Sequence, residues 1–462
     1  MKSDILFHQL PAIWLEKEDA YLIYSPRQRE FALLRSDLLE DPMVLRKFRQ
    51  RGFFHPSSDD SSEQVHSIVL VVTKRCNLQC EYCFANSTPW ADSAMAPEMA
   101  VGILHKMADL FRLDRVHFIG GEPTLNLPAI QRVVDHAREL KIHPVYYITT
   151  NGTAPQSVID WMIGQRFIFT VSWDGIKDAH DRHRPFAGGQ GSVKNVQETI
   201  LYLVKKNADF RVRMTVTKSN LPYLAKSVHW CADHGVKFVH PEPMRPDGRG
   251  AILLDSVVSP NEFVQVFSEI VEIAEERSLW IVNSALSNLF EPKQYFCPSA
   301  RGRTYHFNPD GSISLCYQVQ AMHDPLSDVF TIGYYSANNN GTGITLDRNR
   351  AERLRSLGSD AYRSCRECFL RYVCSGGCPY RSLKAGRSRC TDPWTCQIRM
   401  GILRASIVHI YKRALQEKGS CLEGTFRFYH KTIVEREARY AQARIKSEQQ
   451  NTSSRYKPGN KT

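Results

Sequence analysis

Residues 67–83 read SIVLVVTKRCNLQCEYC. The first seven, Ser67–Thr73, are mostly apolar and β-branched, which predicts a strand buried on both of its faces. Three cysteines follow within eight residues, at positions 76, 80 and 83. A buried strand that leads into closely spaced thiols indicates a metal centre beside a sheet. We call residues 76–83 the first cysteine loop.

The same strand pattern recurs along the next part of the chain. Apolar runs alternate with amphipathic segments, which indicates a parallel sheet covered by helices on both faces. Right-handed crossovers would curl six such units into an α/β fold, a (β/α)6 partial TIM barrel, with its active site at the C-terminal strand ends. The predicted strands are Ser67–Thr73, Arg115–Ile119, Val145–Thr150, Phe167–Trp173, Phe210–Thr217 and Lys237–Glu242.

Composition excludes several protein classes. Of 462 residues, 42% are hydrophobic and 23% charged, as in soluble globular proteins and unlike disordered chains. No stretch approaches the roughly 18 apolar residues of a membrane helix, and the start lacks a secretory signal, so we expect a cytoplasmic protein. The net charge of +12 fits a basic surface or an acidic partner. Arginine–aromatic interleaving is missing, so we expect no nucleic-acid partner.

The first cysteine loop has the ligands for an iron–sulfur cluster. Thirteen cysteines in a reducing compartment are expected to be thiols or metal ligands. Three thiolates can hold three irons of a [4Fe–4S] cluster and leave the fourth iron open. The alternatives are a zinc site or plain buried thiols. Structural zinc takes four tetrahedral ligands in matched pairs, which a trio fits poorly.

The loop resembles the CxxxC-aromatic-xC motif of the radical SAM superfamily, with Tyr82 as the aromatic residue. Further motifs follow in the family's order, each at the end of a predicted strand. A glycine pair alone is usually only a turn, but the ordered set, over roughly residues 66–245, is specific. The further motifs are Gly120–Pro123 (GGEP), Thr150–Gly152 (TNG), Ser172–Gly175 (SWDG) with His180, Asp181 and Arg184, and Arg213–Thr217 (RMTVT).

This resemblance implies a cofactor and a site. Cys76, Cys80 and Cys83 would be the catalytic residues, holding a cluster whose open iron binds S-adenosylmethionine. An electron from the cluster would cleave that cofactor to a 5′-deoxyadenosyl radical. The implied cofactor-binding residues are Gly120, Gly121 and Glu122 at the methionine end, and Ser172, Asp174 and Arg213 on the ribose or carboxylate side.

A second group of cysteines, which we call the second cysteine field, spans residues 297–396. A zinc ribbon separates its two CxxC pairs by about 15–20 residues, and the five residues after Cys368 are too few. The spacing resembles the SPASM domain, an auxiliary-cluster module of radical SAM enzymes with the pattern C-x9–15-G-x4-C, gap, C-x2-C-x5-C-x3-C, gap, C. The matching cysteines are Cys297, Cys316, Cys365, Cys368, Cys374, Cys378 and Cys396.

The SPASM resemblance implies two auxiliary [4Fe–4S] clusters, and so three clusters in the chain. One would use Cys365, Cys368, Cys374 and Cys396, with Cys390 as the alternative last ligand. The other would use Cys297, Cys316 and Cys378, and its fourth ligand stays open, because Arg303 stands where some relatives have a cysteine. We expect Cys231 and Cys421 to be plain thiols.

The domain plan follows from these motifs. We expect an N-terminal α+β unit at 1–65, either a peptide-recognition module that adds a strand to a sheet edge or a structural extension. The radical SAM partial barrel would span 66–290 and the SPASM domain 291–400. Residues 401–462 would form a C-terminal helix and a disordered basic tail.

The leading functional hypothesis is a maturase that oxidatively modifies a ribosomally made peptide or a protein, for example by a crosslink. Its partners would be the precursor peptide or protein and a low-potential electron donor such as flavodoxin or ferredoxin, without a membrane. One alternative is a formylglycine-generating anaerobic sulfatase maturase, whose relatives have an aspartate after the cysteine matching Cys316, where this chain has Tyr317. The others are a radical SAM enzyme acting on a small molecule and a non-catalytic iron–sulfur protein.

Overall fold

The structure is a computed structural model that describes residues 2–26, 28, 30–53, 65–289, 293, 295–338, 341–386 and 392–416. It divides into two compact units, Met1–Val408 and His409–Thr462. The four predicted domains therefore stay a prediction, and the part of the predicted tail beyond residue 416 lies outside the described residues. Within those residues, no helix combines the length and apolar character needed to cross a membrane.

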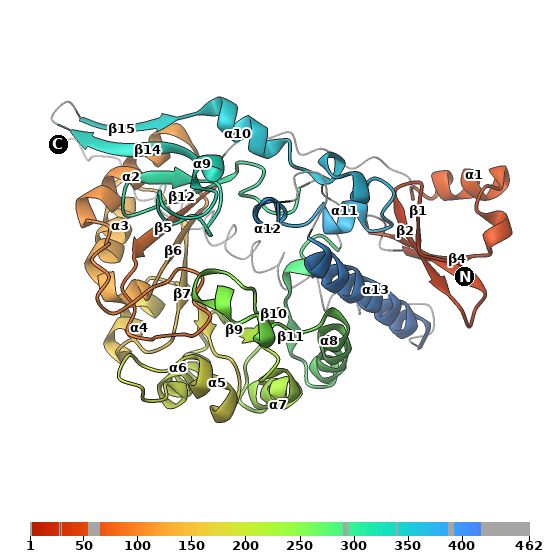
Figure 1. The fold of residues 1–462 in the computed structure, drawn as a ribbon, viewed down its shortest axis with the longest axis horizontal. Coiled ribbons are helices and arrows are strands. Elements are labelled where there is room, and N and C mark those ends of the chain that lie inside the picture. The colour runs from red at the N-terminus through yellow and green to blue at the C-terminus, as the bar shows by residue number, and fades with distance from the viewer. Residues whose placement is uncertain are drawn as a thin grey trace, which may run out of the picture. The chain divides into compact units, whose positions relative to one another are not determined.

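A parallel sheet curled into a partial barrel forms the centre of the fold, as predicted (Figure 1). Its six predicted strands are β5 (Ser67–Thr73), β6 (Arg115–Gly120), β7 (Val145–Thr150), β8 (Ile168–Ser172), β9 (Phe210–Val216) and β10 (Phe238–Pro243). The intervening helices are α2 (Pro97–Leu110), α3 (Leu127–Glu139), α4 (Gln156–Gly164), α5 (Lys177–His183), α6 (Val193–Lys205) and α7 (Leu224–Asp233), with α8 (Pro260–Glu276) after β10.

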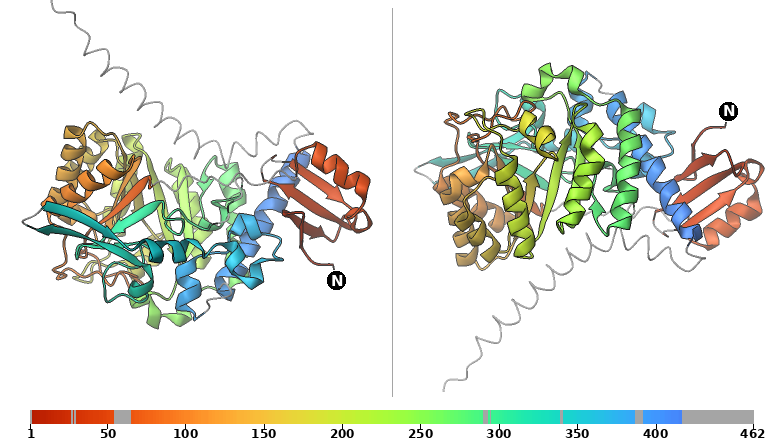
Figure 2. Two further views of the ribbon diagram at one scale, coloured as in Figure 1. Left: turned by 90° about the horizontal axis from the view of Figure 1, so that it is seen from above. Right: turned by 90° about the horizontal axis from the view of Figure 1, so that it is seen from below.

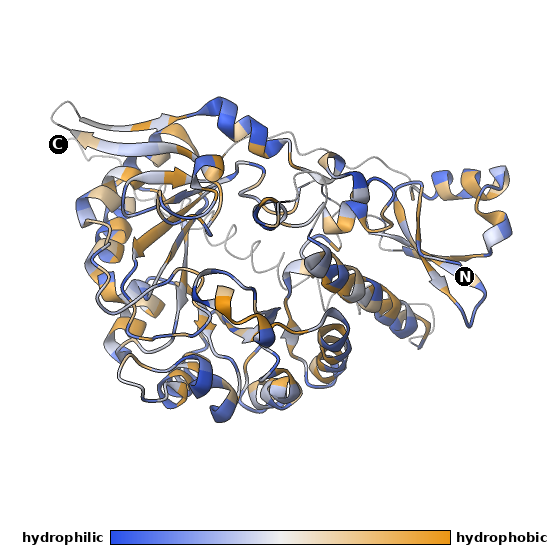
Figure 3. Ribbon diagram, viewed as in Figure 1, coloured by the Kyte–Doolittle hydropathy of each residue, from blue (hydrophilic) through white to orange (hydrophobic). Residues whose placement is uncertain are grey.

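Strand β5 shows why this sequence forms a central strand. Ile68, Leu70, Val71 and Val72 are fully buried, because β6 pairs with β5 on one side and helices cover the sheet. Burying each such side chain contributes about 1.5–3 kcal/mol. The apolar strands are orange in Figure 3, and the outward faces of the helices carry the blue, hydrophilic residues.

The sheet is larger than the predicted six strands. Beside β10 lies the short β11 (Trp280–Ile281), and β12 (Thr304–Phe307) pairs in parallel with the other edge of β5. The antiparallel strands β13 (Ser312–Ser314), β14 (Thr331–Asn338) and β15 (Gly341–Leu346) extend it further. From the sequence we predict no strands in this part of the second cysteine field. Strands of two to four residues are too short to show a period in sequence, so the pairing with β5 was not predictable.

Short helices carry the rest of the second cysteine field. These are α9 (Ser327–Phe330), α10 (Arg348–Arg355), α11 (Arg371–Cys374) and α12 (Pro379–Lys384). The long helix α13 (Pro393–Gln416) begins before the predicted boundary at 401, so Cys396 lies in its first turn. Cys396 is therefore held by regular secondary structure, whereas Cys390 and Cys421 lie outside the described residues.

The N-terminal unit is α+β, as predicted. Its four antiparallel strands are β1 (Ile5–Phe7), β2 (Leu10–Leu15), β3 (Ala20–Ser25) and β4 (Glu30–Leu34), in that spatial order, followed by α1 (Pro42–Gln50). The Asp41 carboxylate caps α1 by accepting from the Met43 and Val44 backbone amides. Ala12, Ile23 and Phe53 form its small core. Figure 2 shows this sheet in red, with β1 and β4 at its edges.

Candidate active site

The first cysteine loop leaves the C-terminal end of β5, where the parallel strands present their ends together. The side chains of Cys76 and Cys80 are buried, at 7% and 9% exposure, and Cys83 is partly buried. Burial raises the pKa of Cys76 to about 12, and the neighbouring Glu122 and Cys80 add to this. Isolated thiolates are therefore costly here, and a positive metal centre is what would compensate them. The donor set fits an iron–sulfur cluster.

The turn after β6 supports the loop from one side. The backbone amides of Gly121 and Glu122 donate to the carbonyls of Thr73 and Arg75, each at 2.8 Å. A Cβ on Gly121 would lie 2.2 Å from the Arg75 carbonyl oxygen. These glycines therefore allow the backbone of the first cysteine loop and of the residues before it to approach closely. Contact of Gly120 and Gly121 with a cofactor stays a prediction.

Glu122 organises the strand ends. Its carboxylate accepts from the Thr150 hydroxyl at 2.8 Å, from the Asn151 backbone amide at 2.7 Å and from the Thr124 hydroxyl at 2.7 Å. Burial raises its pKa, and these hydrogen bonds oppose that rise. The Asn151 side chain in turn donates to the Cys76 sulfur at 3.8 Å. Glu122 thus reaches the first thiol through Asn151.

A second group of residues approaches Cys80. Asp174 follows β8 and pairs with Arg184, whose guanidinium Nε lies 3.0 Å from a carboxylate oxygen. The Arg184 Nη1 donates to the Cys80 sulfur at 3.9 Å. The Tyr82 hydroxyl also bonds to Asp174. Burial raises the pKa of Cys80 to about 11, and the charges of Arg184 and Arg249 oppose that rise.

Ser172, the last residue of β8, lies beside Arg213 in the middle of β9. They are register partners across β8 and β9, and both are partly exposed. The site residues predicted on four neighbouring strands therefore lie on one edge of the sheet. Their contact with S-adenosylmethionine stays a prediction.

The segment Arg245–Arg249 was missed by the sequence analysis. Arg249 donates through Nε to the Cys80 carbonyl at 2.9 Å and through Nη1 to the Ser87 carbonyl at 2.7 Å. Gly248 has φ +54°, and a Cβ there would lie 2.4 Å from the Cys83 carbonyl oxygen. Asp247 pairs with Arg381 at 3.1 Å and with Lys384, both on α12. This segment therefore touches both cysteine regions. The only sequence signal was the turn-forming PDG.

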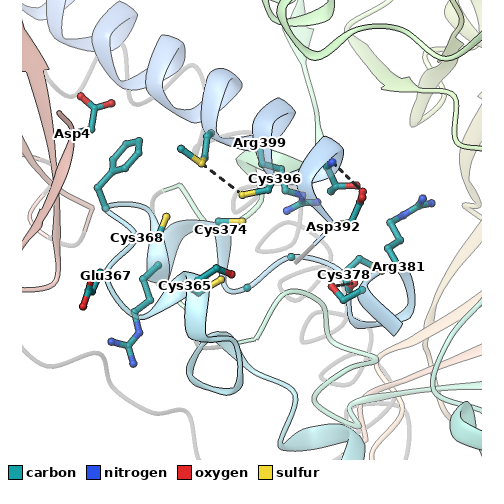
Figure 4. Close-up of a pocket in the computed structure, with 18 of the residues that line it drawn as sticks. Asp4, Cys365, Glu367, Cys368, Cys374, Cys378, Arg381, Asp392, Cys396 and Arg399 are labelled. Atoms are coloured by element: carbon teal, nitrogen blue, oxygen red, sulfur yellow. Dashed lines mark hydrogen bonds between the residues drawn. The ribbon is translucent and has the colours of Figure 1, made fainter. Parts of the chain in front are cut away.

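In the second cysteine field, one cavity of about 430 Å³ is lined by five of the predicted cysteines, including the four that were predicted to hold one cluster. Figure 4 shows the sulfur atoms of these four residues turned toward one another, with Asp4 on the opposite wall. We call this the four-thiol cavity. The sulfurs approach from α11, α13 and the loops before α11. The four thiols are those of Cys365, Cys368, Cys374 and Cys396.

The other three predicted thiols form a separate group. Burial raises the pKa of Cys297 to about 12, and the neighbouring Cys378 adds to it. Burial also raises the pKa of Cys316, again with Cys378 and Cys297 as neighbours. Cys378 is therefore the centre of this trio, although its residue also lines the four-thiol cavity. Cys231 is buried in α7, and burial alone raises its pKa.

Tyr317, directly after Cys316, lies between the two regions. Its ring meets that of Phe84, the residue after Cys83, edge to face at 5.6 Å. Burial of the hydroxyl raises the pKa of Tyr317 to about 12, with Arg213 and Arg245 opposing. The residue as a whole is 43% exposed.

Comparison with known proteins agrees with this geometry. Residues 70–229 match the model of the Radical SAM superfamily. Uncharacterized protein MJ0907 of Methanocaldococcus jannaschii is 28% identical over 258 residues, 55% of this chain and 86% of the relative. A serine-type anaerobic sulfatase-maturating enzyme of Bacteroides thetaiotaomicron is 22% identical over 358 residues, 69% of this chain and 83% of the relative.

Among solved structures, native anSMEcpe with bound AdoMet and Cp18Cys peptide superposes with a TM-score of 0.61. It is 17% identical, and the match covers 76% of this chain and 99% of that one. This likeness concerns the fold. The family match identifies residues 70–229 as a radical SAM domain, in agreement with the strand-end motifs around the first cysteine loop.

Proposed function

We propose that this protein is a radical SAM maturase that oxidatively modifies a peptide or protein substrate. The observation that carries the proposal is the position of Cys76, Cys80 and Cys83 in one loop at the C-terminal edge of the barrel, where they belong to one packed cluster. There the thiols meet donors from Asn151 and Arg184. The cluster and the cofactor are proposed to bind there.

S-adenosylmethionine bound at the cluster would supply a 5′-deoxyadenosyl radical, which takes a hydrogen atom from an unactivated C–H bond of the substrate. The chain's own residues hold the sulfurs and keep water out. Glu122 and Asn151 fix the end of the loop at Cys76, and Arg184 and Arg249 fix it at Cys80. Partly exposed Ser172 and Arg213 are proposed to contact the cofactor's ribose or carboxylate.

The second cysteine field is proposed to hold two auxiliary clusters. The four-thiol cavity offers a complete set of ligands for one of them. Cys297, Cys316 and Cys378 offer three ligands for the other, whose remaining iron would be open to substrate or solvent. A substrate radical must lose an electron in an oxidative modification, and these clusters are proposed to accept it. The protein that supplies the low-potential electron for cleavage of the cofactor would be a flavodoxin or ferredoxin.

A peptide substrate is supported by the relatives. One matures a sulfatase, and one structural neighbour holds a peptide. The N-terminal sheet has edge strands, β1 and β4, that pair on one side only within the described residues. An extended leader peptide could add a strand to either edge.

Formylglycine formation is the second candidate, because a sulfatase-maturating enzyme is among the relatives. Tyr317 argues against it. With a pKa near 12 its phenol stays protonated at neutral pH and cannot serve as the base that an aspartate would supply at that position. The crosslinking outcome is therefore favoured over formylglycine formation.

The test is anaerobic turnover of the reconstituted enzyme with S-adenosylmethionine and dithionite. We expect about twelve irons per chain for three [4Fe–4S] clusters, and formation of 5′-deoxyadenosine. Cys80→Ala is the control, and equal yields from the two proteins would refute the mechanism. Mass spectrometry of a co-expressed candidate peptide should show the loss of two hydrogen atoms per crosslink. If the enzyme acted only on small molecules, the assignment of a peptide or protein substrate would be wrong.

A further inference from the structure

Arg184 is a buried cation in direct reach of a predicted cluster ligand. It is 8% exposed. Its Nη1 donates to the Cys80 sulfur at 3.9 Å, and its Nη2 donates to the Thr215 hydroxyl at 3.3 Å. The guanidinium carbon lies 5.3 Å from the centre of the Tyr82 ring. A charge held this close to sulfur acts through a medium of low dielectric constant.

The backbone around Arg184 is fixed on both sides. Its amide donates to the His180 carbonyl at 2.9 Å, which closes α5, and its carbonyl accepts from the Ser192 hydroxyl at 2.6 Å. The His180 ring lies between Ser192 and Asp174: its Nε2 is 3.0 Å from the Ser192 hydroxyl, and its Nδ1 accepts from the Asp174 amide. The side chain of Arg184 therefore starts from a rigid position.

Asp174 holds the guanidinium in place. It is 3% exposed. One carboxylate oxygen bonds to Arg184 and to the Tyr82 hydroxyl, and the other accepts from the Thr215 amide at 2.8 Å. Both oxygens are thus engaged by the protein. These contacts fix Asp174, and Asp174 in turn holds Arg184 beside the first cysteine loop.

The two ends of the loop have opposite electrostatic surroundings. Cys76 has the buried carboxyl of Glu122 and the neutral amide of Asn151 as neighbours. Cys80 has the cations Arg184 and Arg249 as neighbours, together with the anion Asp174, whose effect is smaller than that of Arg184. Negative charge that arrives at the loop is therefore stabilised from the Cys80 side.

We propose that Arg184 is a positioning residue that donates to the Cys80 sulfur and, balanced by Asp174, sets the reduction potential of the cluster held by the first cysteine loop. The inference rests on the proposed function, because it needs a cluster at these thiols. Hydrogen bonds to sulfur and nearby positive charge favour the reduced state of an iron–sulfur cluster and raise its potential. Arg184 would thus make the cluster easier to reduce.

If Arg184 has this role, substitutions of Arg184 and of Asp174 should shift the reduction potential of the cluster in opposite directions. Arg184→Met removes the donor and leaves the Asp174 anion unbalanced, so the potential should fall. Asp174→Asn leaves the Arg184 cation unbalanced, so the potential should rise. Arg184→Lys keeps the charge without the guanidinium fork, and its shift should be downward but smaller. A residue that only maintained the fold would not shift the potential in two directions.

The experiment is an EPR-monitored redox titration of the reconstituted enzyme. The signal that changes when S-adenosylmethionine is added identifies the cluster of the first loop. Arg138→Met is the matched control, since it removes an arginine that is 62% exposed on α3 and paired with Asp135. It should leave the potential unchanged.

The outcomes separate the inference from the proposed function. Absence of a cofactor-responsive signal in the wild type would refute the proposed function itself. A normal wild-type signal with unshifted potentials in Arg184→Met and Asp174→Asn would refute the role of Arg184 alone. If Arg184→Met fails to assemble the cluster, Arg184→Lys and Asp174→Asn decide, and shifts of the same sign in both would also overturn the inference.

Discussion

The first cysteine loop and the four-thiol cavity are both sets of convergent thiols, yet they are built differently. The loop is clamped by side chains and backbone from the ends of β6, β7 and β8 and from the segment after β10. The cavity is lined by short helices and loops of the second cysteine field, by the start of α13 and by residues near the N-terminus. The difference indicates that the two sites have different tasks. A site that positions a reactive cofactor needs a fixed geometry, whereas an electron acceptor needs only its ligands and proximity.

The largest expected difference between the two regions comes from removing one thiol in each. Cys80→Ala should abolish 5′-deoxyadenosine formation and remove about four irons. Cys374→Ala should also lower the iron content, but the cofactor should still be cleaved. In that variant the oxidised peptide should not accumulate. Iron analysis and product quantification on the same samples check this, and undiminished peptide product from Cys374→Ala would remove the second field from the electron path.

Substitution of Asp247 tests whether the segment after β10 holds the second cysteine field in place. Asp247 is buried beside Arg381 and Lys384 of α12. Asp247→Asn leaves the mostly buried side chain of Arg381 without its anion and should lower the free energy of unfolding by about 3 kcal/mol. The loss should fall mainly on iron in the second field, with the cofactor-responsive signal of the first loop retained. Asp255→Asn, at an exposed position, is the charge control, and equal losses from both variants would contradict the assignment.

Gly248 tests the first loop in the complementary way. A methyl group there would meet the carbonyls of Cys83 and Phe84, and φ is +54°. Gly248→Ala should displace the loop and cost about 2–4 kcal/mol, from left-handed strain plus overpacking. Gly189→Ala is the matched control, since its φ is +85° but nothing lies within 4 Å. It should show only the strain, about 1–2 kcal/mol. Equal effects in urea unfolding and iron content would mean that close packing at 248 is unimportant.

A feature could be predicted from the sequence when the residues that indicate it are neighbours in the chain. The loop cysteines, the six barrel strands and the strand-end motifs were predictable because each rests on neighbouring residues and a period. Arg249 was not, because its partner Cys80 is 169 positions away. The pairing of β12 with β5 was hidden by the brevity of β12. Glu122 as a cofactor-binding residue stays a prediction, and its hydrogen bonds to Thr150 and Asn151 could not be read from a turn motif.

The smallest expected effect is a pH dependence that belongs to the first region. His180 is fully buried beside Asp174 and Ser192. Burial lowers its pKa to about 3, with a further decrease from Arg184 and an opposing increase from Asp174. The folded state therefore keeps the ring neutral, while the unfolded chain binds a proton below its ordinary pKa of about 6.5.

Because the folded pKa is depressed, the contribution of His180 to stability is complete above pH 6.5 and is lost as the pH falls toward 3. Between about pH 5 and 6 the wild type should lose about 1.4 kcal/mol more than His180→Gln, whatever the variant's baseline stability. Urea unfolding of both proteins at several pH values measures the slopes, and His143→Gln, at an exposed position, controls for loss of an imidazole. Parallel curves for the wild type and His180→Gln would show that the ring beside Asp174 is already protonated in the folded state, and the charge balance assigned to the Asp174–Arg184 pair would then have to include that extra cation.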